Sequence, residues 1–387
     1  MDDNDIILTV DGLETQFRLD EGVVRAVAGA SLSIKRGTTV CVVGESGCGK
    51  SITARSILGL VEPPGVVAGG HIWWKAPARD DASSQVTRRR LQRGRRRTPR
   101  QSNGAANSTG PGDSLVDLAQ LDPHSETIRR IRGNDISMVF QEPMASLSPM
   151  YTIGDQLREA IRLHLDVDQR QAHERSIGLL SRVGIPRPQD TMRAYSFQLS
   201  GGMCQRVMIA MALSCDPALL IADEPTTALD VTTQARIIDL FREVQQGTGM
   251  ALMFITHDLG VVAEIADEVV VMYLGTVVER GAVDEIFHDP KHPYTKALLA
   301  SMPRIDAPRG TRVEPIPGHV PAPLDRPTGC PFHPRCASAI PGLCDTMDPP
   351  DVTIGDGRTA RCVLYEPKLL DASHDLTEAA TTKRASQ

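Results

Sequence analysis

The sequence predicts an α/β fold built on a mainly parallel sheet, because strand-like runs alternate with helical stretches along the chain. Four apolar runs have the length of strands: 39–43, 136–140, 218–222 and 251–255. Four stretches have helical spacing: 51–60, 153–165, 171–183 and 203–213. Further short strands are predicted within 6–35, around a turn at 20–22, and at 71–74, 269–272 and 276–279.

The composition is that of a globular protein. The chain has 387 residues, of which 41% are hydrophobic and 23% are charged. This length suits one large domain with a smaller one, and the net charge of -6 gives no general attraction to nucleic acid. An apolar stretch of about 18 residues, as a membrane span requires, is missing from the sequence, and the acidic start at 1–5 predicts no secretory signal. We therefore expect a cytoplasmic protein.

Changes of composition divide the chain into parts. Residues 76–112 carry two arginine triplets among Ser, Asn, Gly and Pro, which predicts a disordered insertion; a solvated loop is favoured over an RNA- or lipid-binding segment. With no internal repeat, residues 1–288 are expected to form one large domain. Ten prolines between 315 and 350 exclude long regular elements from a smaller domain at 289–366. Residues 367–387 are expected to be a flexible tail.

A glycine-rich loop at 44–51, here called the phosphate loop, follows the first apolar run and matches G-x-x-x-x-G-K-[ST]. Glycine lets backbone N–H groups approach phosphate oxygens closely, and the positive end of the next helix faces the same ligand. Lys50 would supply a charge for the β- and γ-phosphates, and Ser51 a hydroxyl for Mg²⁺. The predicted ATP-binding residues are Gly44, Glu45, Ser46, Gly47, Cys48, Gly49, Lys50 and Ser51.

Two acids follow the apolar run at 218–222. A strand there would deliver Asp223 to the carboxyl edge of the sheet, where ligands of open α/β sheets bind. Asp223 is then expected beside Mg²⁺, and Glu224 is expected to polarise the attacking water. Many strands end in acids, so this prediction depends on the pairing with the phosphate loop.

Four further motifs resemble those of the ATP-binding cassette (ABC) superfamily, in the same order along residues 5–287. Their residues are Gln141 of the Q-loop, Ser200, Gly201, Gly202 and Met203 of the signature, Asp230 of the D-loop and His257 of the switch. Each has an ordinary structural interpretation by itself, such as a helix N-cap for Ser200. Together they imply an ABC-type P-loop nucleotide-binding domain with a RecA-like core, an antiparallel β subdomain and a helical signature subdomain.

The resemblance also implies roles for these residues. In this superfamily two cassettes enclose two nucleotides, and the signature of one faces the phosphate loop of the other. Ser200 and Gly202 would then donate to the γ-phosphate held by the partner cassette. The implied Mg²⁺ residues are Ser51, Gln141 and Asp223, and the implied catalytic residues are Glu224, His257 and Gln141.

An aromatic ring that stacks on adenine is expected before the phosphate loop in this family. Phe17 is the candidate in this sequence, and a ring that simply packs on the sheet is an equally weighted interpretation.

Finer details resemble the D-type subunit of the oligopeptide/dipeptide importers. Met203 replaces the commoner signature glutamine, and the segments 141–149 and 292–299 also fit this branch. The resemblance implies a heterodimer with an F-type ATPase subunit, bound to two transmembrane permease subunits. The chain would then be a peripheral protein at the cytoplasmic face of the inner membrane. An extracytoplasmic substrate-binding protein would be an indirect partner.

Three alternatives stay open. Importers of nickel or glutathione share these motifs. An ABC ATPase that acts on nucleic acid or the ribosome is disfavoured, because such proteins usually carry two ATPase units, coiled coils or zinc modules. A regulatory binder without hydrolysis is disfavoured because every catalytic position is filled.

Four of the eight cysteines gather near the C-terminus: Cys330, Cys336, Cys344 and Cys362. A reducing compartment argues against disulfides, and four thiolates suit an iron–sulfur cluster or zinc. Zinc is disfavoured because a close C-x2–4-C pair is missing from this cluster, and unliganded thiols are a third interpretation. Resemblance to the Cys-rich C-terminal domain of the same importers implies a [4Fe–4S] cluster that stabilises this small domain.

Overall fold

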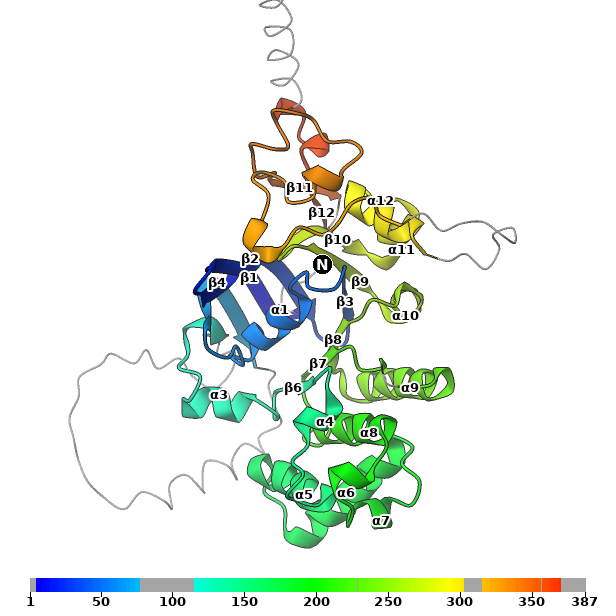
Figure 1. Cartoon of the computed structure of the whole chain (residues 1–387). Coiled ribbons are helices and arrows are strands. Elements are labelled where there is room, and N and C mark those ends of the chain that lie inside the picture. The colour runs from blue at the N-terminus through cyan, green and yellow to red at the C-terminus, as the bar shows by residue number, and fades with distance from the viewer. Residues whose placement is uncertain (1–4, 77–114, 228, 303–314, 356, 370–387) are drawn as a thin grey trace, which may run out of the picture. The chain divides into compact units, whose positions relative to one another are not determined.

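The computed structural model describes residues 5–76, 115–227, 229–302, 315–355 and 357–369 (Figure 1). The predicted insertion at 76–112 lies outside the described residues except for residue 76, as does the predicted tail beyond residue 369. Two compact units are found. One, here called the signature unit, comprises Met1–Thr9, Ser33–Gly37 and Ile72–Leu252; the other, the phosphate-loop unit, comprises Val10–Leu32, Thr38–His71 and Met253–Gln387.

A four-stranded sheet is formed near the N-terminus. Its order is β2-β1-β4-β5, where the strands are β1 (Ile6–Leu19), β2 (Gly22–Lys35), β4 (Gly65–Lys75) and β5 (Leu115–Asp117). The predicted turn at 20–22 is correct, but β1 and β2 have 14 residues each and are not the short strands expected. Alternating burial along both strands explains their length, since each presents one apolar face to the core.

The phosphate-loop unit contains a mixed sheet in the order β11-β12-β10-β9-β3. β3 pairs with β9 in parallel, whereas β9–β10, β10–β12 and β11–β12 are antiparallel, so the sheet of this unit is less parallel than predicted. Its elements are β3 (Thr39–Val43), α1 (Lys50–Ile57), α10 (Leu259–Ile265), β9 (Glu268–Tyr273), β10 (Thr276–Ala282), α11 (Val283–His288), α12 (Pro293–Ala300), β11 (Asp351–Gly355) and β12 (Arg358–Arg361).

The signature unit contains a parallel pair of strands and a group of helices. Ile136 of β6 (Ile136–Val139) is in register with Leu219 of β7 (Leu219–Asp223). Helices α4, α5, α6 and α8 pack on one another (Figure 1). The helices of this unit are α3 (Glu126–Ile131), α4 (Pro143–Ser146), α5 (Ile153–His164), α6 (Gln169–Arg182), α7 (Pro188–Thr191), α8 (Gly201–Ala212) and α9 (Val231–Thr248).

Strand β8 (Ala251–Ile255) is divided between the two units. At its start, the Ala251 N–H donates to the Ala218 carbonyl at 2.8 Å, just before β7. After its end, the Thr256 N–H donates to the Val42 carbonyl of β3 at 3.4 Å. All five residues of β8 are buried, as the apolar run predicted.

The C-terminal segment at 315–369 is built from short elements. Its described strands have five and four residues, and the rest consists of turns and single 3₁₀ turns at Pro323–Asp325, His333–Arg335 and Val363–Tyr365. This follows from the prolines, which fix φ and lack a backbone donor. Glu279 of β10 is in register with Ala360 of β12, so the segment adds strands to the sheet of the phosphate-loop unit.

The described helices include none that is both long and apolar enough to cross a membrane.

Candidate nucleotide site and cysteine cluster

The phosphate loop connects β3 to α1, as the sequence predicts. Gly44 has φ 151° and Gly49, the N-cap of α1, has φ 99°. A Cβ atom on Gly44 would lie 2.2 Å from the Met272 carbonyl oxygen, and one on Gly49 would lie 2.3 Å from the Ala26 carbonyl oxygen. Only glycine fits at both positions, so the loop is held close to neighbouring backbone as well as shaped for a ligand.

Lys50 is buried at the start of α1, with 6% of its surface exposed. Its Nζ donates to the Gly44 carbonyl at 2.8 Å and to the Glu45 carbonyl at 3.0 Å. A buried ammonium group needs such partners. Lys50 is thereby directed into the curve of the loop, where the sequence predicts that it meets phosphate.

Glu224 follows β7 in a backbone conformation that is rare for residues other than glycine, with φ 47°. Gln141 Nε2 donates to Glu224 Oε2 at 3.2 Å, and Thr227 Oγ1 donates to the same oxygen at 3.1 Å. Its neighbour Asp223 is buried, with 2% exposed. The structure therefore brings together Gln141, Asp223 and Glu224, which the sequence assigned to one site, and adds Thr227, which it did not.

The signature motif forms the N-terminus of α8. Ser200 caps this helix, because its Oγ accepts from the Met203 N–H at 3.3 Å. Ser200 and Gly201 are exposed, while Gly202 and Met203 are half-buried. Further along the helix, buried Gln205 donates to the Pro225 carbonyl at 2.8 Å, which ties α8 to the residue after Glu224.

The D-loop and switch residues lie at the starts of two other helices. Asp230 is exposed and caps α9 by accepting from the Thr233 N–H and hydroxyl at 3.0 and 2.7 Å. These bonds, the hydroxyl first, lower the pKa of Asp230. His257 is exposed between β8 and α10 in the phosphate-loop unit, two residues before that helix begins.

Phe17 lies on β1 and is half-buried. A Cβ atom on Gly65 would lie 2.6 Å from Phe17 Cε1, so the ring already packs closely on the backbone of Gly65. This contact agrees with the interpretation that the Phe17 ring packs on the sheet. Its stacking on adenine stays a prediction.

The four C-terminal cysteines line one common cavity, together with Phe332 and His292 among others. Burial is the main cause, and the neighbouring cysteines a smaller one, of the raised pKa values of Cys330, about 12, and Cys362, about 11. In the described part of the chain no group of three or more His, Cys, Asp or Glu side chains is arranged to hold a metal ion. Four cysteines around one cavity form a donor set that fits an iron–sulfur cluster or a zinc ion.

Two contacts to the phosphate loop were not predicted from sequence. Arg335 pairs with Glu45 through Nη1 to Oε2 at 2.7 Å and Nη2 to Oε1 at 3.1 Å. The Glu45 N–H donates to the Tyr294 hydroxyl at 2.9 Å. Tyr294 lies in the segment 292–299 that resembles the importers, and Arg335 directly precedes Cys336 of the cysteine cluster. Nothing in their spacing indicates a partner some 250 to 290 residues away.

Comparison with known protein families agrees with these motifs. A model of the ABC transporter family matches residues 27–109 and 108–227. A second model, described as the C-terminal region of oligopeptide/dipeptide transporters, matches residues 278–344.

Solved ABC cassettes share the fold. The post-hydrolysis dimer of the cassette MJ0796 bound to ADP and Pi has a TM-score of 0.56 at 22% identity, over 72% of this chain and 99% of that one. CbiO1 from Clostridium perfringens, part of the complex cbiONQ, has a TM-score of 0.52 at 24% identity, over 74% of this chain and 92% of that one.

Several relatives are similar over nearly their whole length. A peptide import ATP-binding protein of Brucella abortus is 46% identical, over 93% of this chain and 97% of its own length. The dipeptide transport ATP-binding proteins DppD of Bacillus subtilis and Escherichia coli are each 42% identical, over 94% and 92% of this chain and 96% of their own lengths. The chain therefore belongs to the ABC transporter family, among the ATP-binding proteins of the oligopeptide/dipeptide transporters.

Proposed function

We propose that this chain hydrolyses ATP to drive the uptake of di- and oligopeptides through partner membrane subunits. The observation that carries the proposal is its similarity, at 42–46% identity and over at least 92% of its length, to proteins named for peptide or dipeptide import. ATP with Mg²⁺ is the substrate that this family of ATPases implies. Nickel and glutathione are the alternative cargoes.

We assign the chemistry to Glu224 and to the other residues of the motifs, by the roles that the motifs have in the family. Its carboxylate polarises the water that attacks the γ-phosphate, and Gln141, which already donates to it, orients that water and ligates Mg²⁺. Ser51 and Asp223 complete the Mg²⁺ set, and His257 bonds the γ-phosphate. Lys50 exchanges its carbonyl partners for phosphate oxygens when the nucleotide enters.

A second cassette completes the site in this proposal. The exposed Ser200 and Gly201 begin a helix of twelve residues, whose N–H groups and positive end suit the γ-phosphate of a nucleotide held by the partner. Exposed Asp230 would lie at the same interface. The partner is an F-type subunit of the same transporter, which makes the pair a heterodimer.

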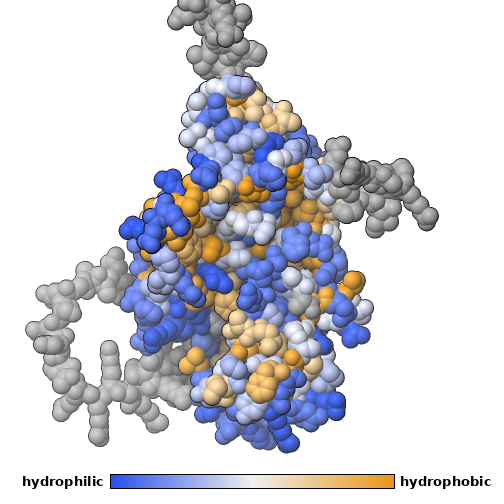
Figure 2. All heavy atoms as spheres, viewed as in Figure 1, coloured by the Kyte–Doolittle hydropathy of each residue, from blue (hydrophilic) through white to orange (hydrophobic). Residues whose placement is uncertain are grey.

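The membrane partners would dock near α4, which places the protein at the cytoplasmic face of the membrane. Hydrophobic side chains interrupt the mostly hydrophilic surface of the helical part of the signature unit (Figure 2). The exposed large apolar residues there include Met144, Met150, Tyr151, Leu163 and Phe197. Exposed apolar patches mark protein contacts. Met144, Met150 and Tyr151 lie within ten residues after Gln141, which would transmit the state of the nucleotide to the permease.

The cargo is tested by reconstituting the chain with its partner ATPase, both permease subunits and the binding protein in vesicles. We expect accumulation of a labelled dipeptide that requires ATP and is lost in the variant Lys50→Ala, since Lys50 is the charge for the phosphates. Uptake of nickel or glutathione in place of peptides would contradict the peptide assignment. A Lys75→Ala variant, which alters a lysine outside the phosphate loop, is the matched control.

We further propose that the C-terminal segment is a distinct small domain that holds a [4Fe–4S] cluster through its four cysteines. Their common cavity supports a shared ligand, and their spacing in the sequence, which lacks a close C-x2–4-C pair, favours a cluster over zinc. When bound, the cluster would supply four iron–thiolate bonds that tie strand β12 to the turns around Cys330 and Cys344. Its role is structural, as a staple for a segment with few regular elements.

Anaerobically purified protein is expected to contain iron and acid-labile sulfide and to show a broad visible absorption band. Each Cys→Ser change at the four positions should remove most of this iron, whereas Cys41→Ser, at a buried strand position of β3, should not. Zinc as the only metal, or retention of iron in all four variants, would contradict the assignment.

A further inference from the structure

The guanidinium of Arg335 is buried beside the phosphate loop, with 4% of its side chain exposed. Besides its two bonds to Glu45, its Nε donates to the Pro317 carbonyl at 2.9 Å and its Nη2 to the Ile316 carbonyl at 3.4 Å. It also lies 5.9 Å from the centre of the Tyr273 ring. The guanidinium of Arg335 is therefore held in place by the C-terminal segment itself, and its two terminal nitrogens are directed at Glu45.

Two side chains, Arg335 and Tyr294, hold Glu45 in place. Arg335 holds its carboxylate, and the Tyr294 hydroxyl accepts from its backbone N–H. Its carbonyl accepts from both Lys50 and the Cys48 N–H, at 3.0 and 3.3 Å. The second residue of the phosphate loop thus joins the C-terminal segment to the lysine that the family uses for phosphate.

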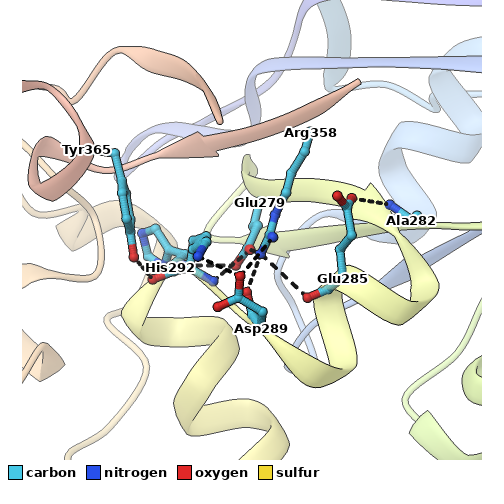
Figure 3. Close-up of polar contacts among 8 residues, drawn as sticks. Glu279, Ala282, Glu285, Asp289, His292, Arg358 and Tyr365 are labelled. Atoms are coloured by element: carbon cyan, nitrogen blue, oxygen red, sulfur yellow. Dashed lines mark hydrogen bonds and ion pairs between the residues drawn. The ribbon is translucent and has the colours of Figure 1, made fainter. Parts of the chain in front are cut away.

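The start of α12 is in turn held by the buried ion pair of Glu279 with Arg358 (Figure 3). Glu279 accepts from the N–H groups of Lys291 and His292 at 2.8 Å each, and His292 Nδ1 accepts from the Tyr294 N–H at 3.0 Å. Arg358 of β12 donates to Glu279 at 3.0 Å. The start of α12, and with it Tyr294, is thereby fixed from the strand that leads to Cys362.

Tight aromatic packing links the two contacts. Phe332 lies 5.2 Å from Tyr273 and 5.3 Å from Tyr294, measured between ring centres. Phe332 comes two residues after Cys330 and three before Arg335, so the same short stretch carries a cavity cysteine, the central ring and the guanidinium. A shift of this stretch would move Arg335 away from Glu45.

We propose that Arg335 and Tyr294, here called the C-terminal clamp, are positioning residues that preorganise the phosphate loop for nucleotide. The clamp fixes Glu45, and with it the backbone of the phosphate loop, before ATP arrives, so that less ordering is required on binding. The C-terminal segment thereby sets the affinity of the chain for ATP. This inference rests on ATP binding, which follows from the family, and not on the metal centre or on peptide as cargo.

The test compares variants of the full-length chain by titration calorimetry with MgATP and by thermal melting without nucleotide. Tyr294→Phe removes only the hydroxyl, and Arg335→Gln removes only the charge and fork. Each is expected to weaken MgATP binding about tenfold, the scale of a few side chains that must now be ordered on binding. Arg335→Lys keeps the positive charge but cannot form two parallel bonds to the carboxylate, so it should lose less of the affinity for MgATP than Arg335→Gln.

The matched control is Arg361→Gln, which breaks an ion pair with exposed Asp348 in the same C-terminal segment. It should leave the dissociation constant unchanged. In ATPase assays of the assembled transporter, the clamp variants should raise KM for ATP with little change in kcat, because they touch neither Glu224 nor Gln141.

A double variant tests whether Arg335 acts through Glu45. If Arg335 acts through Glu45, then Arg335→Gln combined with Glu45→Gln should bind MgATP no more weakly than the weaker single variant. Variants that melt at lower temperature but bind MgATP with unchanged affinity would overturn the inference and leave the clamp a structural contact only. Equal weakening in Arg361→Gln would overturn it as well, since the effect would then not be specific to Glu45.

Discussion

Glu224→Gln is expected to leave MgATP binding intact and to lower kcat for ATP hydrolysis by about 10²–10⁴-fold, the usual contribution of a general base. The amide keeps the shape of the carboxylate and can still accept from Gln141 and Thr227, which now donate at 3.2 and 3.1 Å. It cannot take a proton from water at neutral pH. The fold should therefore be retained while the chemical step is lost.

Single-turnover hydrolysis and calorimetry with MgATP measure the two parts of this expectation. With hydrolysis blocked, the nucleotide should also hold two cassettes together, which size-exclusion chromatography detects as a dimer that persists in ATP. The control is Glu243→Gln, which alters an exposed glutamate of α9 paired with Arg182 and should keep full activity. Unchanged hydrolysis in Glu224→Gln would show that another group activates the water.

Arg358→Met is expected to destabilise the C-terminal segment by about 3–5 kcal/mol, because it leaves the carboxylate of Glu279 buried without its cation. Both side chains are almost fully buried, with 5% of Arg358 and none of Glu279 exposed. Arg358 also donates to the backbone carbonyls of Asp289 and Glu285 (Figure 3), so those contacts are lost together with the ion pair.

Hydrogen exchange measures this effect locally. The amides of Lys291 and His292 donate to Glu279, and they should exchange about 100- to 4,000-fold faster in the variant, at tenfold per 1.4 kcal/mol. Arg361→Met removes an ion pair whose carboxylate, Asp348, is 60% exposed, and is expected to cost at most about 1 kcal/mol. Equal protection in Arg358→Met and the unaltered chain would mean that Glu279 finds another partner.

Local patterns predicted most strands and helices well. β3 and β8 begin and end at the predicted residues, because uniformly buried strands read as unbroken apolar runs. The helix predicted at 51–60 is α1 and ends earlier, at Ile57, since Leu58 and Gly59 turn the chain. The ends of helices depend on capping contacts that periodicity does not show.

Helix α9 was missed, although it is the longest described helix at 18 residues. Its buried residues Ile237, Ile238, Phe241 and Val244 do recur at helical spacing, and Asp230 caps its start. Three β-branched residues, at 231–233, open the helix and weaken its local signal. Burial of one face outweighs that propensity in the folded chain.

The sequence by itself determined the chemistry: the order of its motifs identifies an ABC ATPase, and its cysteine spacing and signature methionine indicate the peptide-importer branch. Only the tertiary structure decided which distant residues meet. Gln141 reaches Glu224 across 83 residues, and Arg335 reaches Glu45 across 290. The physical reason is that a motif records which backbone and side-chain groups a ligand requires over a few neighbouring residues. A contact between distant segments depends on sheet register and core packing, to which residues throughout the unit contribute.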